Sequence, residues 1–185
     1  MTGSMAMGDG GRGNRLRPFV WGGAACLLLL PAVAMRFFPG SGVDWSAADF
    51  VAMGLLLAIA CGIYELGAWA SQDVAYRLGF GVAALAGFLT VWVNLAVGML
   101  GSENDAINLM FAGVLLVAAS GALIAVLRPA GMARAMLATA AAQLLAAGIG
   151  LGMGEFQPLE LALTAMFALP WLASAALFQR AARRS

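Results

Sequence analysis

Six apolar stretches of about twenty residues follow one another along this chain, and each is long enough to cross the ~30 Å hydrocarbon core of a bilayer as a helix rising 1.5 Å per residue. Short segments join them, which predicts antiparallel neighbouring helices. We therefore predict an all-α, polytopic membrane protein: a six-helix transmembrane bundle formed by one domain over residues 15–185. The stretches are Arg17–Phe38, Asp49–Ala70, Tyr76–Leu100, Asn104–Leu127, Met132–Gly152 and Leu159–Gln179.

The composition agrees with a membrane setting. Of the 185 residues, 63% are hydrophobic and 10% are charged, whereas a soluble globular protein has about 25% charged residues. A chain of this composition has too few polar side chains to cover a water-exposed surface. The lipid bilayer is therefore the expected surrounding of most of the protein, and the glycine-rich residues 1–14 are expected to form a flexible cytoplasmic tail.

The distribution of arginine predicts the orientation. Nine of the ten arginines fall on one side of the predicted bundle, and only Arg36 falls on the other. By the positive-inside rule the arginine-rich side is cytoplasmic, so both termini are expected inside. The first stretch also resembles a signal peptide, with the small triplet Ala32-Val33-Ala34 as a cleavage site, but we expect it to remain as the first membrane helix.

Several functions are not expected. The chain has no histidine, which argues against helical zinc sites and histidine-ligated haem. Its basic and acidic residues nearly balance, so no nucleic-acid partner is expected. Cys26 and Cys61 lie in apolar stretches, where packing is the simpler interpretation and a copper(I) or thiol-redox site is the alternative. No nucleophile with a base is apparent, so we expect no enzyme, cofactor or metal.

Polar residues at membrane depth are the first candidate site, because they are costly in hydrocarbon. Glu65 is expected to pair with Arg77 or Arg134 near the cytoplasmic side, with a proton or cation site as the alternative. Asn94 and Gln143 are expected to hydrogen-bond between helices, with contact to a solute as the alternative.

The outer turn between the third and fourth stretches is the second candidate site. Ser102 and Asp105 fit a capping box at the start of the fourth helix. Acidic residues outnumber basic ones on this side, which predicts a mouth that attracts cations. Its oxygen ligands suit calcium or magnesium, but their spacing is irregular and we expect no metal site. The candidate mouth residues are Asp49, Glu103, Asp105, Asn108 and Glu160.

Small residues and prolines predict how the helices pack. The alanine-rich fifth stretch is expected inside the bundle, and Pro31 and Pro170 are expected to bend their helices. Stripes of small residues at four-residue spacing are expected to let helix backbones approach closely. They comprise Gly54, Ala58 and Gly62; Gly79, Ala83 and Gly87; and Ala138, Ala142, Ala146, Gly150 and Gly154.

A distinctive motif surrounds the outer turn. Trp92-Val-Asn94-Leu-Ala-Val-Gly98 is followed by Gly101-Ser102-Glu103 and by Asn108-Leu-Met110. With Tyr64-Glu65 and Gly131-Met-Ala-Arg134 among others, it resembles a widespread group of small, uncharacterised bacterial inner-membrane proteins. The resemblance covers roughly Asp49 to Arg184. It implies a multi-pass protein of the bacterial inner membrane and implies no particular activity.

Two functions of different kinds remain as hypotheses. One is a small transporter or ion-conducting protein, expected to be a homo-oligomer because six short-looped helices leave little room for a private pathway. The other is a non-catalytic accessory or assembly subunit of a larger membrane complex. The intramembrane polar residues and the acidic mouth favour the first, whereas a polar-free belt facing the lipid would favour the second.

Overall fold

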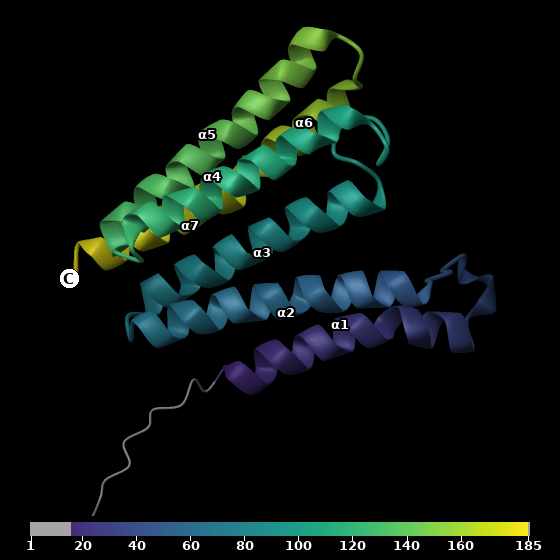
Figure 1. Ribbon diagram of the computed structural model, residues 1–185, viewed down its shortest axis with the longest axis horizontal. Coiled ribbons are helices and arrows are strands. Elements are labelled where there is room, and N and C mark those ends of the chain that lie inside the picture. Colours follow the sequence, from purple (N-terminus) through teal and green to yellow (C-terminus); the bar gives the residue numbers. More distant parts are fainter. Residues whose placement is uncertain (1–15, 185) are drawn as a thin grey trace, which may run out of the picture.

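The computed structural model describes residues 16–184, and within them it is helical with no β-strand (Figure 1). Six apolar spans are long enough to cross a membrane, which confirms the all-α, six-span prediction. The tail predicted for residues 1–14 lies outside the described part of the chain. The elements are α1 (Arg17–Phe37), η1 (Pro39–Ser41), α2 (Ala47–Ala70), α3 (Val74–Ala96), η2 (Ala106–Asn108), α4 (Leu109–Ala125), α5 (Pro129–Met153), α6 (Pro158–Met166) and α7 (Ala168–Ala182).

The sixth span consists of two helices, α6 and α7, separated by Phe167. Pro170 has no backbone N–H to donate to the carbonyl of Met166 four residues earlier, so the helical hydrogen bonding is interrupted there. The predicted disturbance at Pro170 is thus a break in the helix. By contrast, α1 continues through Pro31 without interruption.

The spatial order of the helices differs from their order in the chain (Figure 1). Helix α5 contacts α4, α6 and α7; α7 also packs on α3; α2 packs on α3, and α1 packs on α2. Consecutive helices were predicted to be neighbours, and this is largely wrong for α3 and α4, which meet at few points. Helix α7 packs against both α3 and α5, so α7 rather than α4 is the closer partner of α3.

Three aromatic rings form the centre of the main core. Phe178 of α7 meets Tyr76 and Phe80 of α3 with ring centroids 5.4 and 5.3 Å apart. Such edge-on pairs add to the free energy gained by burying the rings. Gly79 allows this contact, because a Cβ there would lie 3.1 Å from the Phe178 ring. Helix α5 is the most buried span, as its alanine content predicted, whereas α1 buries no residue.

The two ends of the bundle differ in charge. Described arginines other than Arg36 lie at or near the end where α1, α3 and α5 begin, which we call the arginine-rich end. The opposite end, which we call the acidic end, carries Arg36 and six carboxylates. These are Asp44, Asp49, Glu103, Asp105, Glu155 and Glu160.

Candidate functional site: the cleft between α3 and α4

A cleft separates α3 from α4. It consists of a hollow of about 470 Å³ near the acidic end and one of about 750 Å³ toward the arginine-rich end. Val91 of α3 and Leu115 of α4 line both, so the two hollows adjoin at these residues. Each volume falls within the roughly 300–1,000 Å³ typical of small-molecule sites. The cleft is therefore the strongest candidate for a binding site.

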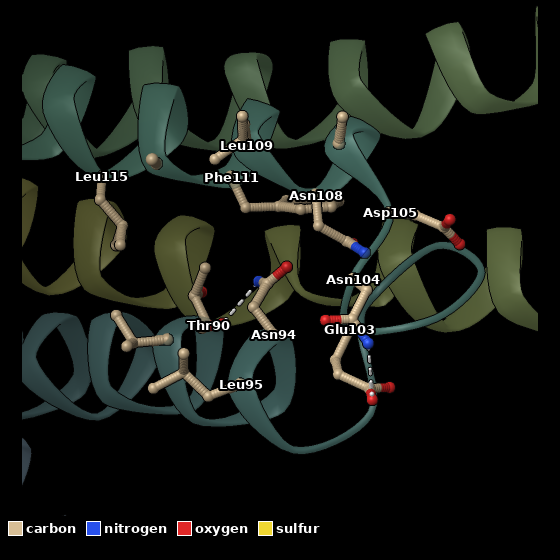
Figure 2. Close-up of a pocket in the computed structure, with 13 residues that line it drawn as sticks. Thr90, Asn94, Leu95, Glu103, Asn104, Asp105, Asn108, Leu109, Phe111 and Leu115 are labelled. Atoms are coloured by element: carbon tan, nitrogen blue, oxygen red, sulfur yellow. Dashed lines mark hydrogen bonds between the residues drawn. The ribbon is translucent and has the colours of Figure 1, made fainter. Parts of the chain in front are cut away.

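The outer hollow is where polar side chains meet the cleft. Figure 2 shows Thr90 and Asn94 on the α3 wall, with Asn108 and Phe111 opposite them and Glu103 and Asn104 at the end of the hollow. The sequence predicted Asn94 and the outer-turn residues as separate sites. The structure brings Asn94, Glu103, Asp105 and Asn108 to one hollow.

Asn108 holds the outer turn in shape. Its Oδ1 accepts the backbone N–H groups of Met99 and Leu100 at 3.0 and 3.1 Å. Its Nδ2 donates to the carbonyls of Leu100 and Ser102 at 3.0 and 2.7 Å. Gly98 has φ +75°, and a Cβ there would lie 2.6 Å from the Ser102 carbonyl carbon. One amide and one glycine thus fix the backbone that ends the outer hollow.

The capping box predicted for Ser102 and Asp105 is only half present. The Asp105 carboxylate accepts the Ser102 N–H at 2.7 Å, but the Ser102 hydroxyl donates to the same carboxylate instead of accepting a helix amide. The reason is that helical structure begins only at Ala106, so Asp105 occupies the N-cap position. Glu160 approaches the same turn, accepting the Gly101 N–H at 3.4 Å.

Asp49 does not belong to this turn. It forms a complete capping box with Ser46 at the start of α2, accepting the Ser46 N–H at 2.7 Å. The Ser-x-x-Asp spacing before an apolar stretch was a signal for this cap. Of the five predicted mouth residues, four therefore surround one turn and Asp49 stands apart. Among residues 16–184, no three carboxylate or cysteine side chains are grouped so as to hold a metal ion.

Asn94 bonds within its own helix, so the predicted interhelical bond is wrong. Its Nδ2 donates to the Thr90 carbonyl at 2.7 Å, and its Oδ1 is buried without a hydrogen-bond partner among the described residues. The cleft explains this difference, because it keeps α4 away from the α3 face that carries Asn94. A buried acceptor without a partner is uncommon and costs free energy.

Gln143 does bond between helices, as predicted. It is fully buried, and its Nε2 donates to the Thr164 carbonyl of α6 at 2.9 Å. The Thr164 hydroxyl donates in turn to the Met99 carbonyl at 2.9 Å. This chain of bonds joins α5, α6 and the backbone of the outer turn, behind the cleft.

The inner hollow is almost entirely apolar. Side chains of α2, α3, α4, α5 and α7 line it, and many are large aliphatic groups such as Ile63, Leu123 and Leu127. Trp171 of α7 contributes to its wall and is only 2% exposed, yet its Nε1–H has no partner among the described residues. Polar side chains thus reach only the outer hollow, where apolar groups still form most of the lining, and the inner hollow is apolar.

Glu65 lies away from the cleft, and its predicted partners are wrong. Its Oε1 pairs with Arg17 Nε at 3.2 Å and accepts the Trp21 Nε1–H at 3.2 Å, both from α1. The α2 face that packs on α3 carries Tyr64 and Ala68, so the neighbouring Glu65 points toward α1. Glu65 therefore attaches α1 to α2 rather than joining three helices.

Arg77 and Arg134 donate hydrogen bonds to nearby backbone carbonyls instead of pairing with Glu65. Arg77 donates to the carbonyls of Ser71 and Ala68 at 2.8 and 3.1 Å, satisfying the end of α2. Arg134 donates to the Ala130 carbonyl one turn earlier in α5. Helix depth was predictable from the sequence, but the direction of each side chain around its helix was not.

Two further contacts at the arginine-rich end were not predicted. Asp73 caps α3 by accepting the Tyr76 N–H at 2.9 Å, and it also pairs with Arg184 at 3.6 Å. The Tyr76 hydroxyl donates to the Leu127 carbonyl at 2.6 Å. Asp73 lies just before the third apolar stretch, and an aspartate in that position was a signal for an N-cap.

Comparison of the chain with protein-family models, with curated proteins and with solved structures found no match.

Proposed function

We propose that this protein is a small membrane transporter whose solute occupies the cleft between α3 and α4. The observation that carries the proposal is the separation of these two consecutive helices by a space of ligand size with a polar end and an apolar end. Binding sites of transporters lie inside the membrane between helices that move relative to one another.

The extent of the polar region argues against an inorganic ion as the solute that a single chain carries through its cleft. Among the described residues that line the cleft, polar side chains extend inward only to Thr90, whose hydroxyl donates to the Ala86 carbonyl. Beyond it the wall is apolar. An ion there would lose its hydration without gaining ligands, which costs several kcal/mol or more. The transport hypothesis is therefore favoured over ion conduction within a single chain.

The linker between α4 and α5 holds an uncommon backbone conformation beside the inner hollow. Val126 and Leu127 have φ values of +47° and +58°, a left-handed conformation that costs about 1–2 kcal/mol for such residues. Helix α4 packs mainly on α5, and its contact with α3 is slight.

The membrane and the orientation of the protein in it are part of the same proposal. The arginine-rich end faces the cytoplasm of a bacterial inner membrane, so the polar end of the cleft faces outward. The arginine asymmetry supports the orientation, and the six apolar spans support the membrane setting.

Solute distribution between cells and medium tests this function whichever solute the protein carries. Cells that produce the wild type are compared with cells that produce Ala119→Phe, which fills the inner hollow from an exposed position of α4. Ala141→Phe is the matched control, because Ala141 is exposed on α5 and does not line the cleft. We expect at least one solute to shift several-fold with wild type and with Ala141→Phe, but not with Ala119→Phe.

The accessory-subunit hypothesis is the second candidate. Helix α1 buries no residue and exposes large apolar side chains, including Phe19 at 73% and Phe37 at 68%, so its surface is open to lipid or to another membrane helix. If no solute shifts and a protein partner instead co-purifies in a fixed ratio with both variants, the transporter proposal is wrong and the accessory function is favoured.

A further inference from the structure

The charge of the cleft lining restricts what it can bind. Among residues 16–184, the charged side chains that line it are Glu103 and Asp105, and none of the lining residues is an arginine. Both carboxylates lie on the exposed outer turn. A phosphate or carboxylate group at this end would meet like charge with no compensating cation, whereas a positive group would be attracted.

The hydrogen-bonding groups of the outer hollow point to the same chemistry. The missing bond of Asn94 is at its Oδ1, which is an acceptor. This oxygen is buried, so it does not open into the hollow. The acceptors that a head group can reach are the carboxylates of Glu103 and Asp105 on the exposed outer turn. The outer hollow therefore requires a donor, and a cationic N–H group combines donation with positive charge.

The inner hollow requires an apolar body. It is the larger of the two hollows, at about 750 Å³, and its wall is aliphatic and aromatic. Several of its wall residues, such as Ile59 at 58% and Leu123 at 79%, are also exposed at the protein surface, so the hollow opens sideways toward the bilayer. An apolar chain can enter from the membrane and remain out of water, which stabilises it by about 0.8 kcal/mol per buried CH₂ group.

We infer that the cleft binds a lipophilic amine: a cationic N–H head group near Asn94 and Glu103, and an apolar body in the inner hollow. This inference rests on the proposed function and names its class of solute. The occupant is a free amphiphile and not a bilayer phospholipid, because the phosphate of a phospholipid would lie beside the carboxylates without a basic residue.

Photolabelling of the whole chain in phosphatidylcholine nanodiscs tests the inference. The probe is a long-chain primary alkylamine with a diazirine near the end of its chain, and the matched probe carries a carboxylate in place of the amine. We expect the amine to label cleft residues such as Leu115 and Ala119 at least about tenfold more than the carboxylate does, which corresponds to about 1.4 kcal/mol. Excess unlabelled alkylamine should remove the labelling, and phosphatidylethanolamine in the bilayer should not.

Variants separate head-group recognition from plain apolar binding. Glu103→Gln lies on the exposed turn and is expected to fold normally, and it should lower labelling by the amine several-fold without changing labelling by the carboxylate. Ala119→Phe should remove labelling by both probes, while Ala141→Phe should leave it unchanged.

Three results would overturn the inference: equal labelling by both probes, competition by phosphatidylethanolamine, or cross-links between two copies of the chain in the cleft. Failure here differs from failure of the proposed function. Labelling of the cleft by the amine without any solute shift in cells would refute transport alone. A cleft-dependent solute shift without preference for the amine would refute the lipophilic amine alone.

Discussion

Gly67 of α2 lies so close to the ring of Phe80 in α3 that a Cβ at position 67 would overlap the ring. This contact sets the rotation of α2 and brings Tyr64 and Ala68 to the same face. It also directs Glu65 and the preceding turn toward α1. The close approach of α2 to α3 therefore depends on one glycine, and this glycine is not part of the small-residue stripe predicted for α2.

Gly67→Ala should weaken this packing. Overpacking a tight contact costs about 1–3 kcal/mol, which exceeds the gain of about 1 kcal/mol from replacing glycine by alanine in a helix. Gly62→Ala is the matched control in the same helix, since nothing lies within 4 Å of a Cβ there. Thermal unfolding in detergent should show a lower melting temperature for Gly67→Ala than for Gly62→Ala. Equal melting temperatures would mean that α2 does not pack as described.

Thr164→Val should destabilise the connection behind the cleft. The hydroxyl of Thr164 supplies a hydrogen bond to the Met99 carbonyl of the outer turn, and leaving a buried acceptor unsatisfied costs about 1–3 kcal/mol. Thr139→Val is the control, because that equally buried hydroxyl bonds only to the Ala135 carbonyl of its own helix. Chemical denaturation in detergent compares the two. A loss for Thr139→Val as large as that for Thr164→Val would argue against a special role for the Thr164 bond.

Glu65→Gln should have a small effect on stability. Its partner Arg17 is 67% exposed, and exposed ion pairs contribute about 0–1 kcal/mol. Arg77→Met should cost more, because it removes the donors that satisfy the last carbonyls of α2. Melting temperatures of the two variants in detergent test this order. A larger fall in melting temperature for Glu65→Gln than for Arg77→Met would contradict this order and indicate that Glu65 is important for stability.

The orientation is tested with topology reporters. Fusions at Ser102 and at the C-terminus should report opposite sides of the membrane, with the C-terminus inside, because arginines near the chain end favour the cytoplasm. Readings from the same side would contradict the six-span arrangement, and opposite readings with Ser102 inside would reverse it.

The sequence was sufficient for the spans but not for their packing. Hydropathy predicted six crossings and alanine content predicted the burial of α5. Pro170 predicted a bend, where the structure has a break between α6 and α7. The small-residue stripe of α2 was less informative. At Gly62 a Cβ would have no other atom within 4 Å, so no neighbouring helix packs closely there. Small residues occur on several faces of each helix, and only the neighbouring helices decide which face is used.

The candidate site was predictable only in parts. Asn94 and the outer-turn residues were recognisable as polar groups in costly positions, since that requires depth alone. The partner of Glu65 and the self-bonding of Asn94 depend on rotation about the helix axis. The cleft itself depends on α7 packing beside α3, a contact between residues about a hundred positions apart, such as the 2.8 Å bond from the Ser174 hydroxyl to the Gly79 carbonyl.

Transport by this protein requires the space between α3 and α4 to open. Val91 and Leu115 line both hollows from opposite helices, so Val91→Cys with Leu115→Cys, in a chain carrying Cys26→Ser and Cys61→Ala, allows a thiol cross-linker to join the walls. The two single-cysteine chains treated with the same reagent are the controls. We expect cross-linking to abolish the cleft-dependent solute shift while the controls retain it; an unchanged solute shift after complete cross-linking would contradict the account.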